Sequence, residues 1–194
     1  MPLDRLRKFP TAGPPNDDPA SVKGNLSLDQ KQLLANILAY HIAHHPGSKV
    51  FANEVAGNLK LVEAYIRKSD VPTDGGVKTA VAETVHEVTT GEGMLNVHGS
   101  LAGACGVYFL DLATFSTFFC HGLVSRRDAS GLSTSMNVNW HAPAMRGTKL
   151  RIIGTTLSEG RTTVCRAEAY DKTTGQILIS AVHTMVPFEK SSKL

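Results

Sequence analysis

Cysteine is scarce in this chain: Cys105, Cys120 and Cys165 are the three present in 194 residues. Their number is odd, they are widely spaced, and no CxxC or Cys/His pair has the spacing of a zinc site, so a disulfide framework and a structural metal are both excluded. Each lies in an apolar or strand-like segment, where a buried free thiol is the ordinary outcome. The sequence therefore predicts no metal site and a compartment without disulfide bonds.

The chain also lacks long apolar runs and a strong excess of one charge. No run approaches the roughly 20 apolar residues that cross a bilayer, and the first ten residues, MPLDRLRKFP, have no signal-peptide core. We expect synthesis in the cytosol and no membrane insertion. Lys and Arg number 20 against 17 Asp and Glu and form no cluster. This balance excludes nucleic-acid binding but leaves room for a local phosphate-binding patch.

The first 56 residues are predicted to form an extension to the main domain. Residues 1–24 are rich in Pro, Gly, Asp and Asn, a composition typical of a disordered or loosely draped leader. Residues 27–45 carry apolar side chains at helical spacing, with Ser27 as a candidate N-cap. Three histidines near the end of this helix suggest a metal site or, since no acidic or sulfur partner is near, a polar surface face: His41, His44 and His45.

The remainder, residues 57–188, is predicted to be one α+β domain. Residues 100–122 are apolar on nearly all sides and too long for one strand, which indicates a buried helix that a sheet must wrap. Two strands are expected before this helix and four after it, with short antiparallel turns between the last three: 59–68, 77–88, 132–141, 149–157, 162–170 and 176–187. An antiparallel six-stranded sheet around a long central helix is the hot-dog arrangement. Its open edges predict edge-to-edge dimers.

The segment NVHGSLAGACGVYFLD carries two chemical features. Small residues around Gly103 and Gly106 mark the start of the buried helix, where exposed backbone N–H groups can hold a developing negative charge. Asp111 is a lone carboxylate further along the same helix, which is costly unless it faces a pocket or finds partners. Together they supply an oxyanion donor and a group that activates water or attacks directly, which are the groups needed for acyl transfer to water. A purely structural Asp111 is the open alternative.

The same segment resembles the pattern N-x-x-G-x-L-H-G-G-x-x-x-x-L-x-D of hot-dog acyl-CoA thioesterases related to the phenylacetate-pathway enzymes. The matching positions are Asn96, Gly99, Leu101, Gly103 and Asp111. The later segment GLSTSMNVNWHAPAMRG resembles that family's second signature, G-x-S-x-x-M-N-x-x-Y-x-x-P-A-x-x-G, with Trp140 in place of Tyr. It matches at Ser133, Met136, Asn137, Pro143, Ala144 and Gly147.

This resemblance implies a catalytic assignment for an acyl-CoA substrate, with no cofactor. Asp111 would be the general base or nucleophile, and the Gly103 amide would polarise the thioester carbonyl. Asn96 would orient the water or the carbonyl, and Ser133 would reach in from a neighbouring subunit. The family also implies homodimers or homotetramers. Basic side chains for the coenzyme's phosphates are the candidates Arg146 and Arg161.

One departure from the family pattern concerns the His of its H-G-G triplet, which is Ala102 here. Loss of this histidine, which supports the carbonyl-binding geometry in the family, predicts a slower or an inactive enzyme unless His98 replaces it from one turn earlier. Two alternatives stay open. One is a non-catalytic acyl-CoA-binding protein, and the other is a hot-dog hydratase or dehydratase, although the motifs of those enzymes are missing here.

The tail, residues 189–194, ends in Ser192-Lys193-Leu194. This tripeptide is a peroxisomal address that works at a C-terminus, read by the import receptor. We therefore expect the protein in the peroxisomal matrix, with a role in lipid metabolism.

Overall fold

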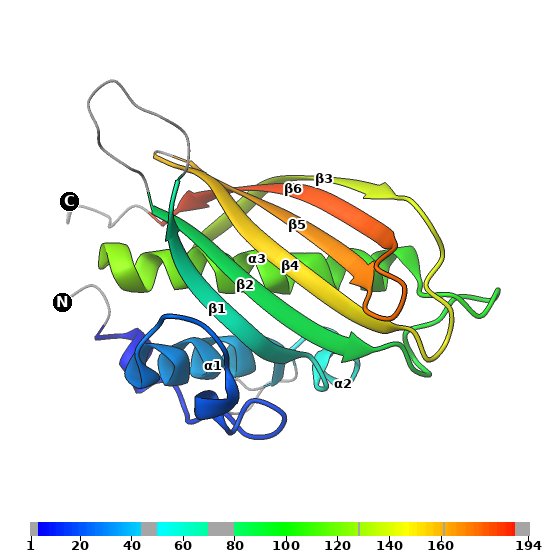
Figure 1. Ribbon diagram of the computed structural model, residues 1–194, viewed down its shortest axis with the longest axis horizontal. Coiled ribbons are helices and arrows are strands. Elements are labelled where there is room, and N and C mark those ends of the chain that lie inside the picture. The colour runs from blue at the N-terminus through cyan, green and yellow to red at the C-terminus, as the bar shows by residue number, and fades with distance from the viewer. Residues whose placement is uncertain (1–3, 44–49, 70–79, 128, 161, 189–194) are drawn as a thin grey trace.

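The computed structural model describes residues 4–43, 50–69, 80–127, 129–160 and 162–188 of the chain. Within them, a long helix, α3 (Gly103–Ser125), lies against the inner face of a six-stranded sheet (Figure 1). Every strand pair is antiparallel, in the order β1-β2-β4-β5-β6-β3. The strand bounds are β1 Lys60–Lys68, β2 Ala80–Thr89, β3 Gly131–Trp140, β4 Lys149–Glu159, β5 Thr163–Asp171 and β6 Ile177–Pro187. The predicted α+β hot-dog arrangement is confirmed.

Helix α3 is buried on nearly all sides, as its sequence predicts. Its largest buried side chains, Phe109, Phe118 and Phe119, are at most 2% exposed. The sheet approaches the helix closely at Gly154 of β4, where a Cβ would overlap the side chain of Thr117. Thr117 Oγ1 lies 2.6 Å from Thr84 Oγ1 of β2. Helix and sheet therefore touch directly at this point.

The length of α3 corrects one expectation from the sequence. By length and composition, this helix could cross a membrane, whereas no run that approaches such a length is expected from the sequence. In the structure, 72% of the most apolar 18-residue stretch of this helix is buried inside the domain. Its apolar surface is therefore already covered by the sheet and by the N-terminal helix, as in the core helix of a globular domain.

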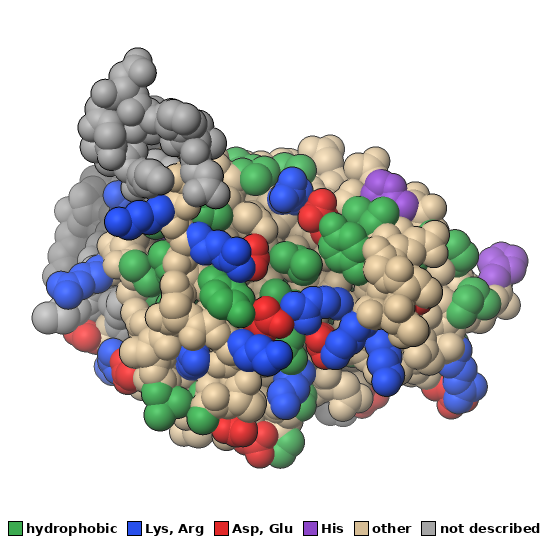
Figure 2. Space-filling view, in the orientation of Figure 1, with side chains coloured by type: hydrophobic (Ala, Val, Ile, Leu, Met, Phe, Trp, Pro, Cys, Tyr) green, Lys and Arg blue, Asp and Glu red, His purple; other side chains and the backbone are tan. Residues whose placement is uncertain are grey.

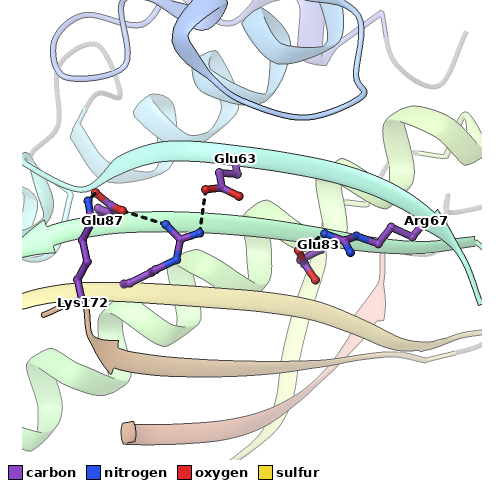
Figure 3. Close-up of polar contacts among 6 residues, drawn as sticks. Glu63, Arg67, Glu83, Glu87 and Lys172 are labelled. Atoms are coloured by element: carbon purple, nitrogen blue, oxygen red, sulfur yellow. Dashed lines mark hydrogen bonds and ion pairs between the residues drawn. The ribbon is translucent and has the colours of Figure 1, made fainter. Parts of the chain in front are cut away.

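The outer face of the sheet carries charged side chains in pairs of opposite sign. Arg151 of β4 donates hydrogen bonds to Glu63 of β1 at 2.8 Å and to Glu87 of β2 at 3.0 Å. Lys172 also donates to Glu87, at 2.7 Å (Figure 3). Figure 2 shows Lys and Arg interspersed with Asp and Glu over this side of the molecule. The face in this view therefore has no large patch of one sign.

The N-terminal extension folds against this domain. Helix α1 (Leu28–Ala43) begins with a capping box: Gln30 N donates to Ser27 Oγ at 3.3 Å, and Ser27 N donates to Gln30 Oε1 at 3.0 Å. Its apolar stripe is buried beside α3. His41 is half-buried among aromatic rings rather than on a polar face, while His44 and His45 lie outside the described residues. The short helix α2 (Asn53–Ala56) precedes β1.

The leader makes specific contacts, where its composition predicts disorder or loose draping. It contains two 3-10 turns, η1 (Leu6–Lys8) and η2 (Pro19–Ser21), and Leu6 is fully buried. The Asn16 side chain donates to Leu59 O and accepts from Leu61 N, both at 2.9 Å. The backbone of Lys23 pairs with that of β1. Its N–H donates to Val62 O and its carbonyl accepts from Ala64 N, both at 2.9 Å. The leader thereby covers the free edge of β1.

Candidate active site

The N-terminus of α3 opens into a cavity of about 440 Å³. Ala102 is the N-cap residue and supplies no side-chain cap, so the first-turn amides that begin with Gly103 face outward without an intrahelical partner. The ring of Trp140 flanks Gly103 at ordinary contact distance. The cavity brings together two of the predicted site residues and is lined by Asn96, Ser100, Leu101, Gly103, Trp140, His141, Ala142, Pro143, Ala144 and Ile179.

Asn96 organises the loop that leads into this helix. Its Oδ1 accepts from His98 N at 2.9 Å and from Ser100 N at 3.3 Å, and its Nδ2 donates to Ser100 Oγ at 3.0 Å. The loop is held to the segment after β3 because Leu101 N donates to Ala144 O at 2.7 Å. Asn96 therefore shapes the cavity wall, and its amide already has partners within the loop.

Asp111 lies two turns further along α3, about 12 Å from Gly103 at the usual helical rise. It is half-buried in the helix and does not line the cavity. Burial raises the pKa of its carboxyl from 3.8 to about 6. Helical side chains tilt toward the helix N-terminus, but one aspartate side chain does not span this separation. The structure thus places a strengthened base on the same helix as the open amides.

His183 of β6 is a neighbour of Asp111 that the sequence analysis did not single out. The ring is fully buried, and its Nδ1 lies 3.8 Å from Asp111 Oδ1 and 2.6 Å from Thr114 Oγ1. The Thr114 hydroxyl donates to the carbonyls of Leu110 and Asp111, so it accepts from Nδ1–H of His183. Burial lowers the pKa of His183 to about 4, and its Nε2 has no partner among the described residues. The neutral imidazole therefore gives its Nδ1–H to Thr114, and Asp111 Oδ1 lies beyond hydrogen-bond distance of it.

The other predicted site residues lie apart from Asp111 in this single chain. Ser133 is exposed on β3, an edge strand, and no hydrogen bond joins it to Asp111 among the described residues. Arg146 borders the cavity loop, where its N–H donates to Gly99 O, and its guanidinium pairs with Glu92 at 2.8 Å. His98 is exposed at the tip of the same loop. Arg161 lies outside the described residues.

The cysteines do not supply a nucleophile. Burial raises the pKa of Cys105 to about 11 and that of Cys120 to about 12, and that of Cys165 lies well above its usual value. Protonated thiols are poor nucleophiles and poor metal ligands. Among the described residues, no group of three His, Cys, Asp or Glu side chains is arranged to hold a metal ion.

Comparison with known proteins identifies the fold. No protein-family model and no curated protein matches the chain. Zebrafish thioesterase superfamily member 2 is similar in structure, with a TM-score of 0.60 and 20% identity, over 80% of this chain and 98% of that one. The mouse thioesterase superfamily member 2 has a TM-score of 0.53 and 21% identity, over 69% of this chain and 85% of that one. The chain therefore has the hot-dog fold of thioesterase superfamily members.

Proposed function

We propose that this protein hydrolyses acyl-CoA thioesters to a free acid and CoA. The observation that carries the proposal is the half-buried Asp111, with a pKa raised to about 6, on the helix whose N-terminal amides open into the cavity. An oxyanion donor and a general base are the two groups that attack of water on a carbonyl requires. The structural similarity to thioesterase superfamily members supports the same conclusion at the level of the fold.

In the proposed mechanism the thioester carbonyl oxygen accepts the Gly103 N–H. About 12 Å separates Gly103 from Asp111 along one helix, so the Asp111 carboxylate that acts on this carbonyl would come from a second subunit. It takes a proton from water as the water oxygen bonds to the carbonyl carbon, and the oxyanion that forms lies at the positive end of the helix dipole. Collapse of this intermediate breaks the C–S bond, and the leaving thiolate receives the proton from Asp111. Asn96 keeps the loop, and hence the Gly103 amide, in position. Direct attack by the Asp111 carboxylate is the variant of this step that the same geometry allows.

The coenzyme end of the substrate is assigned to the cavity mouth. Arg146 and His98 border the loop there. The guanidinium of Arg146 pairs with Glu92, and a phosphate that replaces Glu92 would give it another charge-assisted hydrogen bond. Arg161 remains a predicted contact. Completion of the site by Ser133 of a second subunit fits its exposure on the edge strand β3. The Ser192-Lys193-Leu194 tripeptide lies outside the described residues, and peroxisomal import stays a prediction.

A hot-dog hydratase would need a histidine and an acid that both touch the substrate. The pair His183–Asp111 supplies both residue types, but the ring of His183 is fully buried. A histidine whose buried ring lies 5.7 Å from the ring of Phe115 and 5.6 Å from that of Phe118 cannot reach the substrate. The geometry therefore favours hydrolysis over hydration.

The first test follows free thiol release from a panel of acyl-CoAs, acetyl to palmitoyl plus phenylacetyl. Asp111→Asn should lower kcat/KM by about 100-fold or more, since the isosteric amide accepts no proton. The matched control is Asp29→Asn, which removes an exposed carboxylate of α1 that pairs with Arg7. This variant should keep the wild-type rate. Wild-type turnover in Asp111→Asn would contradict the mechanism. Acyl-CoA binding without any thiol release would support the non-catalytic alternative that Ala102 suggests.

A further inference from the structure

Trp140 is the only tryptophan of the chain and ends strand β3. Its partner across the sheet is Ile179 of β6, whose side chain packs against Gly106 of α3. Residues opposite each other on paired strands share one face of the sheet, so the indole also faces the start of this helix. Nε1 and Cζ2 of the ring lie 3.5 Å from the position that a Cβ on Gly103 would occupy. Trp140 and Gly103 both line the cavity of about 440 Å³.

The indole N–H of Trp140 is a free hydrogen-bond donor. No residue in the described part of the chain accepts a hydrogen bond from its Nε1. An indole nitrogen donates one hydrogen bond and accepts none, and it does not exchange its proton as an acid or a base does. The partner of this N–H is therefore water or an oxygen atom of a ligand that enters the cavity.

The other polar side chains of the described lining already have partners. Asn96 Nδ2 donates to Ser100 Oγ at 3.0 Å, and Asn96 Oδ1 accepts from the backbone of the same loop. Nε2 of His141 lies 2.8 Å from Ser180 Oγ. Trp140 therefore supplies the side-chain donor that remains available to a ligand beside Gly103.

The Trp140 N–H and the Gly103 amide are close enough to share one acceptor. By covalent geometry, the nitrogen of a residue lies about 2.5 Å from its own Cβ position. Nε1 lies 3.5 Å from that position at Gly103, so the two nitrogens are at most about 6 Å apart. An oxygen atom that accepts one N–H···O bond of about 3 Å from each nitrogen fits within this limit.

We propose that Trp140 Nε1–H is the second donor of the oxyanion site, beside the Gly103 amide. This inference rests on the proposed thioesterase function and adds a catalytic residue to it. As the water oxygen bonds to the carbonyl carbon, the π electron pair of the carbonyl moves onto its oxygen, and both N–H groups donate to the anion that forms. The indole gives up no proton, so the proton of the water still passes to Asp111. Ala102, the N-cap residue, has no side-chain donor that could take this role.

The test replaces the indole N–H and keeps the ring. Because the chain has one tryptophan, a tryptophan-auxotrophic host can introduce β-(3-benzothienyl)alanine at position 140 alone, and this isostere carries sulfur in place of N–H. A donor that acts on the transition state contributes to kcat and not to KM. On the best substrate of the acyl-CoA panel, kcat should fall about 100-fold, the usual effect of removing one oxyanion donor. KM should stay within about threefold, and Trp140→Phe should show the same changes.

The control is Phe188→Leu, at an aromatic residue that is as exposed as Trp140, 58% against 56%. Phe188 lies nine residues beyond Ile179, past the other end of β6, and does not line this cavity. Its kcat should stay within about twofold of wild type. A wild-type kcat in the isostere protein would overturn the proposal, even if Trp140→Phe is slow, because the ring would then act by packing alone. Trp140→Phe decides where thermal unfolding shows that the isostere protein is not folded, and an unchanged kcat there overturns the proposal.

Failure of the thioesterase function itself would appear differently, as a wild-type protein that releases no thiol from any acyl-CoA. Calorimetric binding of hexanoyl-CoA and of its thioether analogue hexyl-CoA, which lacks the carbonyl oxygen, then decides. A preference of wild type for hexanoyl-CoA by about fivefold, the usual effect of one hydrogen bond, that is lost in the isostere protein would support the Trp140 contact. Equal binding of the two ligands to wild type, or no binding, would reject it.

Discussion

Asp111 owes its raised pKa to burial, since no anionic neighbour contributes to the shift. A carboxyl with a pKa of about 6 is still ionised at pH 7 to 8, yet it is a stronger base than an ordinary aspartate. Proton transfer is most efficient when the pKa of the base lies near the working pH. The half-buried position on α3 therefore suits this carboxylate to the proposed role of general base near neutral pH.

The pH dependence of hydrolysis should report this pKa. Only the ionised form of Asp111 accepts a proton, so kcat/KM should fall about tenfold per pH unit below about pH 6 and level off above it. The Nδ1–H of His183 is donated to Thr114 and not to Asp111, so His183→Leu should leave the acidic limb near pH 6 and lower the melting temperature. Thiol release measured from pH 4.5 to 8.5 checks the limb, and thermal unfolding checks the melting temperature.

The control for His183 is Val182→Ala, which removes a side chain that is 39% exposed on the same strand. A histidine that only fills the core would lower the melting temperature when it is replaced and leave the acidic limb in place. An acidic limb that moves to higher pH in His183→Leu would contradict this packing role and show that His183 stabilises the ionised carboxylate.

At the scale of elements, the closest approach of helix and sheet is at Gly154. A Cβ there would overlap Thr117 and would approach Ala113 O to 3.2 Å, on a backbone that cannot retreat from the β4 ladder. Gly154→Ala should lower the free energy of unfolding by about 1–3 kcal/mol, the usual cost of overpacking a core. Chemical denaturation measures this. Gly13→Ala, where a Cβ would meet nothing within 4 Å, should change stability by less than about 0.5 kcal/mol. Equal stabilities of the two variants would contradict the close contact.

Elements with a strong local pattern could be predicted from the sequence. Apolar residues on all sides of α3 predict a buried helix. The short turns between β4, β5 and β6 predict these strands and their antiparallel pairing. The leader could not be placed, because its anchors are single hydrogen bonds, such as that of Asn16 to Leu59, without any periodicity.

In the candidate site, too, some residues could be predicted from the sequence and others could not. Gly103 and Asp111 lie eight residues apart, so their position on one helix and their separation of about 12 Å along it follow from the sequence. His183 could not be found, because it meets Thr114 across 69 residues of chain. One signal was present: His183 follows the inward-facing Ala181 by two positions in a strand, and so it must also face the helix.

At the scale of the whole molecule, the two edges of the sheet differ. The leader pairs with β1 through Lys23 and occupies that edge, while β3 has no neighbour beyond β6 within the described part of the chain. Leu132 and Trp140 on β3 are 61% and 56% exposed. An uncovered strand with exposed apolar side chains is an edge that proteins commonly pair with a second copy. We therefore expect the dimer to form through β3.

Leu132→Glu tests this dimer. In a two-fold interface through β3, each new carboxylate would be buried against the strand of the other subunit and should weaken dimerisation by about tenfold or more, or about 1.4 kcal/mol. The control is Leu157→Glu, an equally exposed leucine (52%) on the interior strand β4, which should leave the dimer intact. Sedimentation velocity over a concentration series measures the association. Because Ser133 is predicted to serve the neighbouring subunit, thiol release per chain should fall in parallel with the dimer fraction. Full activity in a monomeric Leu132→Glu protein would mean that each chain builds its site alone.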